Sequence, residues 1–167
     1  MERNHTLGRV WESRFAGGEP MLSSPDSVLF DLGGVLFHYM PERRLEHLVA
    51  MTSLSGTRIQ EKIWKNGYDE TCERGDLDAA ESHAEFCRRL GIDMSYDSFR
   101  AVMAYAFEPN ACVFELARRV ATNHDVAILT NNWQAVEKAL VADYPELARI
   151  FGQHLYFTWR LKGRKPD

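Results

Sequence analysis

The chain has 167 residues, of which 45% are apolar and 26% are charged, and its formal net charge at pH 7 is -4. This composition is ordinary for a globular protein and allows one domain with a sizeable core. It gives no support for nucleic-acid binding, which usually leaves a basic patch or stripe. No apolar run approaches the roughly 18 residues of a membrane span, and the N-terminus lacks the apolar core of a signal peptide. We therefore expect a cytoplasmic protein with no nucleic-acid partner and no membrane partner.

The three cysteines, Cys72, Cys87 and Cys112, are scattered along the chain and form no CxxC pair. This usage argues for a reducing compartment and against a disulfide framework or a thiolate zinc site. His83 and Cys87 are four residues apart on an expected helix, so they could share a face and bind a metal. Because only two such ligands are present, packing is the better interpretation.

The first 20 residues are polar and mixed in charge, with Gly17-Gly18 and Pro20 near their end. We interpret residues 1–20 as a loose N-terminal extension, after which Met21 could begin the fold. A basic arm is the alternative interpretation, but glutamates are interspersed among its arginines.

The fold is predicted to begin with an apolar run, Val28–Phe30, that ends in Asp31 and then Gly33-Gly34. A short run without alternation is typical of a parallel strand that is buried on both faces. The glycines predict a tight turn at which the backbone can approach a ligand closely.

A helical pattern extends from about Pro41 to Pro109, and nothing in this stretch predicts a strand. One helix is expected to begin after Asp76 and to end at Gly91. Another is indicated by apolar residues at helical spacing, namely Phe99, Val102, Met103, Ala106 and Phe107. We therefore expect a helical cap, residues 41–108, inserted after the first strand of a core formed by residues 21–40 and 109–167.

Strands and helices alternate after Pro109. A second apolar run, Val126–Leu129, ends in Thr130-Asn131, and a third strand is expected over Leu155–Trp159. This order predicts an α/β protein with a Rossmann-like parallel sheet and right-handed crossovers.

Three chemically useful residues follow the predicted strands. Ligands of open α/β sheets bind outside the carboxyl ends of the strands, where this chain places Asp31, Thr130 and, beyond the third strand, Lys165. A carboxylate, a hydroxyl and a cation could there meet one phosphate. Aspartate and threonine also end strands because they suit turns and helix caps, so this spacing alone leaves both interpretations open.

Three segments of the chain resemble, in order, the first three motifs of haloacid dehalogenase-like (HAD-like) hydrolases. They are Phe30-Asp31-Leu32-Gly33-Gly34-Val35-Leu36, Ile128-Leu129-Thr130-Asn131 and Gly163-Arg164-Lys165-Pro166-Asp167. The helical insertion falls where that family has its cap. The Asp-Leu-Gly first motif is most similar to a branch of sugar-phosphate phosphatases, as are the segments Glu73-Arg74-Gly75-Asp76-Leu77 and Asp143-Tyr144-Pro145-Glu146-Leu147. Haloacid dehalogenases proper, the competing branch, usually carry an aromatic residue at the position of Gly33.

The resemblance implies a Mg²⁺-dependent phosphomonoester hydrolase that acts on a small phosphorylated metabolite, such as a sugar phosphate. In this interpretation Asp31 binds Mg²⁺ and attacks phosphorus to form an aspartyl-phosphate, while a backbone carbonyl at Gly33 also binds the metal. Thr130 and Lys165 complete the catalytic set by stabilising the phosphoryl oxygens. The phosphate-binding residues implied are Gly33, Gly34, Thr130, Asn131 and Lys165. Candidates for recognising the rest of the substrate are Trp64, Tyr68 and Phe107 in the cap.

Two departures from the family pattern leave an alternative open. Gly33 lacks the carboxylic acid that would protonate the leaving group, which implies a slower enzyme or a better leaving group such as that of a sugar 1-phosphate. No acidic pair follows Lys165 to supply the fourth motif. The alternative is a truncated or degenerate HAD-like domain without turnover, lacking C-terminal strands and binding Mg²⁺ weakly. Its Val28–Phe30 strand would then form a sheet edge through which the chain could self-associate.

Overall fold

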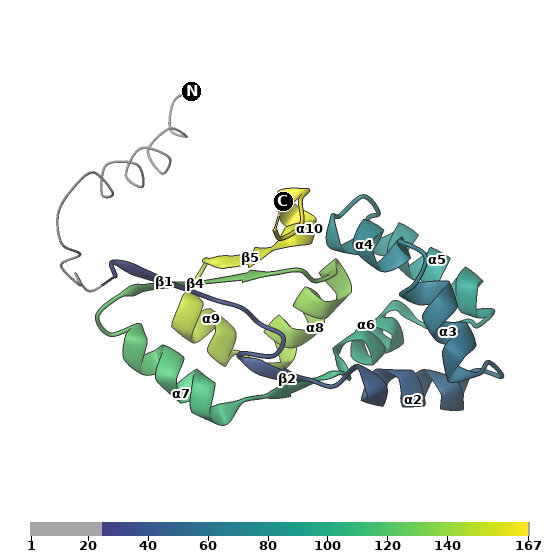
Figure 1. Cartoon of the computed structure of the whole chain (residues 1–167), viewed down its shortest axis with the longest axis horizontal. Coiled ribbons are helices and arrows are strands. Elements are labelled where there is room, and N and C mark those ends of the chain that lie inside the picture. The colour runs from purple at the N-terminus through teal and green to yellow at the C-terminus, as the bar shows by residue number, and fades with distance from the viewer. Residues whose placement is uncertain (1–24, 167) are drawn as a thin grey trace, which may run out of the picture.

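The structure is a computed structural model that describes residues 25–166. The extension expected over residues 1–20 lies outside the described residues. Figure 1 shows the arrangement of the helices and strands. In chain order they are β1 (Ser27–Phe30), β2 (Phe37–Tyr39), α2 (Pro41–Met51), α3 (Gly56–Ile63), α4 (Tyr68–Glu73), α5 (Ala79–Leu90), α6 (Tyr96–Ala104), β3 (Phe107–Pro109), α7 (Ala111–Val120), β4 (Asp125–Thr130), α8 (Gln134–Asp143), α9 (Glu146–Phe151), β5 (Leu155–Phe157) and α10 (Thr158–Leu161).

The main sheet consists of parallel strands in the order β1-β4-β5. Phe30 is in register with Ile128, and Thr130 with Phe157; all four lie on one face and are almost completely buried. Helices α7, α8 and α9 lie along this side of the sheet (Figure 1), and Phe30 meets Phe151 of α9 edge-on with ring centroids 5.6 Å apart. The α/β class and the parallel sheet predicted from the sequence are confirmed.

The opposite face of this sheet is covered incompletely by the described residues. Leu29 is 59% exposed and Tyr156 is 40% exposed; Leu29 is in register with Ala127, and Leu129 with Tyr156. The prediction that the first strand is buried on both faces is therefore wrong within residues 25–166, because only Val28 and Phe30 point toward the helices. Strand β1 pairs with β4 alone in the described sheet, and self-association through its open edge remains a prediction.

The third strand is shorter than expected. It ends at Phe157, and residues Thr158–Leu161 turn into α10 instead of extending the strand to Trp159. Thr158 is buried and its hydroxyl donates a hydrogen bond of 2.8 Å to the carbonyl of Glu73 in the cap. This contact redirects the chain from the sheet edge toward α4.

A small antiparallel pair, β2 and β3, connects the main sheet to helices α2–α6, which are called the cap helices below. The prediction of no strand between Pro41 and Pro109 is therefore wrong at its C-terminal end. Helix α6 ends at Ala104, and Phe107 belongs to β3. The ring of Phe107 packs edge-on against Phe37 with centroids 6.2 Å apart. Phe107 would be buried either in a last turn of α6 or in β3. Its apolar character therefore could not show which of the two elements it belongs to.

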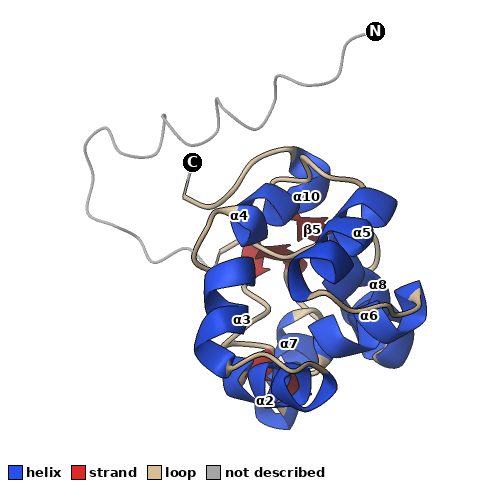
Figure 2. Cartoon of the chain, turned by 90° about the vertical axis from the view of Figure 1, so that its right-hand side faces the viewer, coloured by secondary structure: helices blue, strands red, loops and turns tan. Residues whose placement is uncertain are grey.

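Helices α2–α6 lie between β2 and β3 in the chain and form a layer at one end of the molecule (Figures 1 and 2). Helix α5 begins two residues later than expected, because Asp78 forms a capping box with Glu81. It ends at Gly91 as predicted, where the positive φ of 70° favours glycine. The cap boundaries at residues 41 and 108 remain a prediction. None of the helices within residues 25–166 is long and apolar enough to cross a membrane.

We predict that Leu29→Lys lowers self-association of the protein. A second copy pairing with the β1 edge would cover Leu29, whereas a charged side chain on an edge strand disfavours such pairing. Size-exclusion chromatography with light scattering, over a range of concentrations, should show a smaller dimer fraction for this variant. Leu116→Lys on α7, where the native leucine is 49% exposed, is the matched control. Identical behaviour of both variants and the unmodified protein would contradict the prediction.

Candidate active site

Asp31 and Lys165 form an ion pair at the carboxyl ends of the strands. Asp31 directly follows β1, and its Oδ2 lies 3.0 Å from Nζ of Lys165. The other carboxylate oxygen accepts a hydrogen bond of 2.7 Å from the amide of Leu32. Lys165 Nζ also donates to the carbonyl of Leu129 in β4 at 2.9 Å. The predicted carboxylate and cation are therefore in direct contact, although they are far apart in the sequence.

The loop after β4 determines where Lys165 lies. The side-chain amide of Asn131 donates to the carbonyl of Lys165 at 3.2 Å and accepts from its backbone amide at 2.9 Å. Both groups of Asn131 are thus used to position Lys165. The neighbouring Thr130 is buried, and its Oγ1 accepts a hydrogen bond of 2.7 Å from Asn132. The hydroxyl hydrogen of Thr130 is then free to donate to an anion.

The two glycines after Asp31 have different roles. Gly34 has a φ of 80°, which favours glycine, and its amide donates to the carbonyl of Phe37 at 2.7 Å. That amide closes the turn, and Gly34 does not line the cavity that contains Asp31; phosphate binding by Gly34 remains a prediction. Gly33 does face the same cavity as Asp31. A Cβ placed on Gly33 would meet Phe107 at an ordinary 3.5 Å, so packing does not forbid an acidic residue there.

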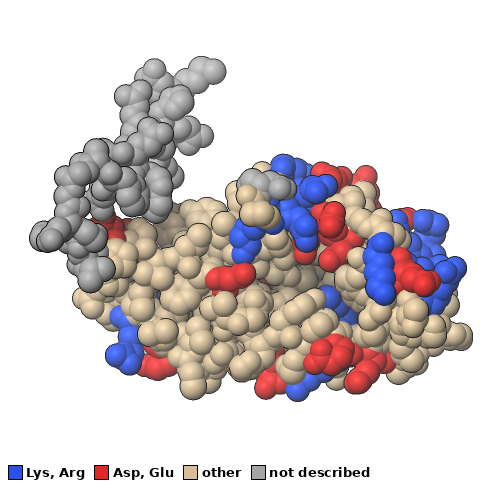
Figure 3. Space-filling view, viewed as in Figure 1, with Lys and Arg blue, Asp and Glu red and all other residues tan. Residues whose placement is uncertain are grey.

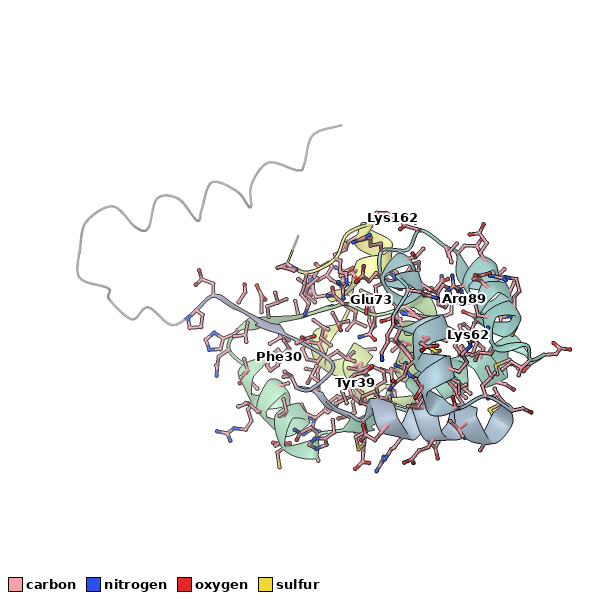
Figure 4. All side chains as sticks on the ribbon, turned by 45° about the vertical axis from the view of Figure 1, so that its right-hand side comes forward. Phe30, Tyr39, Lys62, Glu73, Arg89 and Lys162 are labelled. Carbon is pink, nitrogen blue, oxygen red and sulfur yellow. The ribbon has the colours of Figure 1, made fainter. Side chains whose placement is uncertain are left out.

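These residues line a cavity of about 220 Å³ that lies between the strand ends and the cap. The volume is below the roughly 300–1,000 Å³ typical of sites for drug-sized ligands, so it suits a small metabolite. In Figure 4, Glu73 lies above Tyr39 on the cap side of the sheet. The core contributes Asp31, Gly33, Thr130, Asn131, Asn132, Trp133, Val136 and Lys165, and the cap side contributes Tyr39, Arg44, Asp69, Glu73, Met103 and Phe107.

Trp133 joins the loop after β4 to the cap, and sequence reasoning missed it. Its indole is buried and donates from Nε1 to Asp69 Oδ1 at 2.7 Å. Its ring meets Tyr68, Phe86 and Phe99 with centroids 5.2, 6.5 and 6.2 Å apart. The signal available in the sequence was an aromatic residue directly after the second motif, Thr130-Asn131-Asn132-Trp133.

Two acidic side chains of α4 face the cavity. Burial is the main cause of a raised pKa at Asp69, which the charge of Arg44 opposes. Burial also raises the pKa of Glu73, with the negative charge of Asp69 as the next cause, although Arg164 donates to Glu73 at 2.6 Å. Figure 3 shows acidic and basic side chains gathered over α4 and α10. The charge of Glu73 is balanced by Arg164, whereas that of Asp69 is not balanced by a direct ion pair with a described residue.

The candidates for substrate recognition have different positions. Phe107 lines the cavity. Tyr68 is buried and its hydroxyl donates to the carbonyl of Ser82, so it belongs to the cap core. Trp64 lies outside the cavity, with the guanidinium of Arg44 stacked 4.9 Å from its ring. Of the three, only Phe107 is placed to contact a ligand there.

The residues that could hold a metal ion are few. Within residues 25–166, no group of three or more His, Cys, Asp or Glu side chains is placed to bind a metal. His83 is hydrogen bonded to the carbonyl of Met94 at 2.8 Å, which favours its packing role. Mg²⁺ keeps several waters and often uses one or two carboxylates together with substrate phosphates. The carboxylate of Asp31 and a carbonyl at Gly33 fit the smallest such donor set.

Comparison with known proteins identifies the fold. No family model and no curated protein matches the sequence, but solved structures do. The HAD family enzyme BT-2542 from Bacteroides thetaiotaomicron matches with a TM-score of 0.74 and 20% identity, covering 87% of this chain and 74% of that chain. Its wild-type complex with magnesium and inorganic phosphate has a TM-score of 0.74 and 21% identity, covering 86% and 74%. A predicted HAD-like family hydrolase from Porphyromonas gingivalis has a TM-score of 0.71 and 22% identity, covering 84% and 70%.

The chain is thus an α/β protein whose polar residues meet between the strand ends and a set of inserted helices. Its fold is that of HAD-family enzymes, as the resemblance of its three motifs implies. The more specific assignment to the sugar-phosphate phosphatase branch remains a prediction.

The contacts of Trp133 give a prediction about stability. Trp133→Ala should lower the free energy of unfolding by about 3–5 kcal/mol, because it opens a hole between the core and the cap. Trp133→Phe should cost less, since it retains a ring but leaves the half-buried Asp69 without its indole donor, a loss of about 1–3 kcal/mol. Urea denaturation of both variants measures the two values. Equal losses would show that the ring contacts contribute little.

The raised pKa of Asp69 gives a prediction about pH. Its carboxyl remains neutral in the folded protein to a higher pH than a free aspartate, and it ionises as the pH rises through the raised value. Ionisation adds negative charge to a cavity that is predicted to bind an anion. The affinity for inorganic phosphate in the presence of Mg²⁺ should therefore match that of Asp69→Asn at low pH and fall below it at higher pH. Calorimetric titrations at several pH values test this, and parallel curves would contradict it.

Proposed function

We propose that this chain is a Mg²⁺-dependent phosphomonoester hydrolase that acts on a small phosphorylated metabolite such as a sugar phosphate. The observation that carries the proposal is the direct contact of Asp31 with Lys165 in a cavity that Thr130 also lines. A structural neighbour with the same fold was crystallised with magnesium and inorganic phosphate, which supports this chemistry for the fold.

In this proposal Asp31 is the nucleophile. One carboxylate oxygen is oriented by the amide of Leu32, which leaves Oδ2 to attack phosphorus. The Asp31–phosphorus bond forms as the bond to the leaving oxygen breaks, and water then hydrolyses the aspartyl-phosphate. Lys165, now paired with Asp31, donates hydrogen bonds to the phosphoryl oxygens as their negative charge grows. Thr130 donates its hydroxyl hydrogen to the same group.

Mg²⁺ would be held by Asp31 and a carbonyl of Gly33, and when bound it would reduce the repulsion between the carboxylate and a phosphate dianion. Because Gly33 provides no acid, protonation of the leaving group is not assisted from that position. General acid catalysis is typically worth about 10²–10⁴-fold. The proposal therefore favours substrates whose leaving oxygen is already stable as an anion, as in sugar 1-phosphates.

The small metal donor set favours a second candidate, a domain that binds phosphate without turnover. Within the described residues no group of three or more His, Cys, Asp or Glu side chains is placed to hold a metal, and Lys165 competes with the metal for the carboxylate of Asp31. This candidate predicts measurable phosphate binding without hydrolysis, so one assay separates it from the leading proposal.

The test is hydrolysis of p-nitrophenyl phosphate and of a sugar-phosphate panel, with and without Mg²⁺. Asp31→Asn should reduce turnover to background, because it removes the attacking charge. Lys165→Ala should lower the rate constant by about 10²-fold, as for the loss of an oxyanion donor. Asp125→Asn, at the other end of β4, is the matched control and should leave the rate unchanged. Normal turnover by Asp31→Asn would overturn the nucleophile assignment.

A further inference from the structure

The guanidinium of Arg44 is buried without a direct ion pair among residues 25–166. Arg44 lies on α2 and is only 4% exposed, and no described carboxylate forms an ion pair with it. Of its five N–H donors, one bonds to the Met103 carbonyl at 3.3 Å and one to the Tyr39 hydroxyl at 3.0 Å, which leaves three. The buried Nε has no hydrogen-bond partner.

Packing alone does not account for this arginine. Stacking on Trp64 at 4.9 Å contributes some stabilisation, but desolvating an unpaired charge costs several kcal/mol. An apolar side chain would fill the same space without that cost. The adjacent Arg43, in contrast, is exposed and is paired with Glu108 at 2.6 Å.

Arg44 lines the same cavity as Asp31, Thr130 and Lys165. It comes from the cap side, whereas the other three lie at the strand ends, so an anion bound at Lys165 leaves Arg44 free for a second group. The nearest candidate within the protein, Asp69, is instead held by the indole of Trp133 at 2.7 Å. The cavity thus has two cationic positions. Lys165 forms a direct ion pair with Asp31, whereas Arg44 interacts electrostatically with Asp69 but forms no direct ion pair with a described residue.

We propose that Arg44 binds a carboxylate on the substrate, so that the preferred substrates are 1-phosphates of small sugar acids. This inference rests on the proposed function, since it places the phosphoryl group at Asp31 and Lys165. The planar fork of a guanidinium matches a carboxylate in a two-bond arrangement, and the small cavity favours a carboxylate over a bulkier second phosphate. Arg44 is therefore the residue that selects among phosphomonoesters.

Two phosphonates test the inference without turnover, because their carbon–phosphorus bond has no ester oxygen to leave. 3-Phosphonopropanoate carries a carboxylate where propylphosphonate carries a methyl group. In calorimetric titrations with Mg²⁺, the unmodified protein should bind the carboxylate compound roughly 10- to 100-fold more tightly, as expected for charge-assisted hydrogen bonds. Arg44→Gln should remove this preference, whereas Arg43→Gln, the matched control, should retain it. Equal affinity for the two compounds in the unmodified protein, or a preference that survives Arg44→Gln, would overturn the inference.

Circular dichroism shows whether Arg44→Gln folds. If it does not, Arg44→Lys keeps the charge but loses the fork, and its preference should fall well below that of the unmodified protein; an unchanged preference would overturn the inference. Hydrolysis of p-nitrophenyl phosphate, measured in parallel, separates the two proposals. Phosphonate discrimination without hydrolysis would leave the role of Arg44 standing and refute the enzymatic function. Hydrolysis without discrimination between the two phosphonates would support the enzymatic function and refute the role of Arg44.

Discussion

The buried indole of Trp133 is the contact on which the arrangement of the site depends. Its ring packs against aromatic residues of the cap, and its Nε1 hydrogen bonds to Asp69. Trp133 comes only three residues after Thr130, so the same short loop lines the cavity and fixes the cap above it. Because buried polar groups require partners, neither the indole N–H nor the Asp69 carboxylate can be moved independently. The cap side of the cavity, including Asp69 itself, thereby takes its position from the end of β4.

The same loop positions the chemical groups on the other side of the cavity. Asn131 holds the backbone of Lys165 through two hydrogen bonds, while Lys165 Nζ is fixed between Asp31 and the Leu129 carbonyl. The end of β4 therefore positions Asp31 from the first motif and Lys165 from the third. This explains why residues far apart in sequence converge: parallel strands bring their carboxyl ends to one edge of the sheet, and the loop of the middle strand reaches both neighbours.

Much of this arrangement could be predicted from the sequence, because it depends on local patterns. The unbroken apolar runs before Asp31 and Thr130 indicated strands β1 and β4, and helical spacing indicated the cap helices. The contact between Asp31 and Lys165 followed from strand topology together with the family resemblance. Prediction failed where tertiary contacts determine the local structure. Phe107 pairs as part of a strand, and Thr158 turns the chain toward the cap. The turn that the Gly34 amide closes could not be predicted from composition, and phosphate binding by Gly34 remains a prediction.

Arg44 and Asp69, which line the cavity from the cap side, were missed for a related reason. Arg44 and Asp69 lie among other charged residues, and in the sequence they look like solvent-exposed positions on amphipathic helices. Their burial results from packing between separate helices, as does that of Trp133. No local pattern distinguishes Arg44 from its exposed neighbour Arg43, although the two differ in burial and in ion pairing.

The cap is attached to the core on two sides of the cavity, and this has a kinetic consequence. Besides Trp133, the end of α4 is tied to α10, where Thr158 and Arg164 hydrogen bond to Glu73 and where the backbone of Gly75 lies against the Trp159 carbonyl. The side chains of Asp31 and Lys165 are nevertheless 45% and 32% exposed, so a small molecule can reach them while both attachments stay in place. In the proposed reaction, exchange of substrate and product then needs no separation of the cap from the core. Compounds whose leaving groups differ widely in acidity would therefore keep different maximal velocities, and solvent viscosity would leave those velocities unchanged.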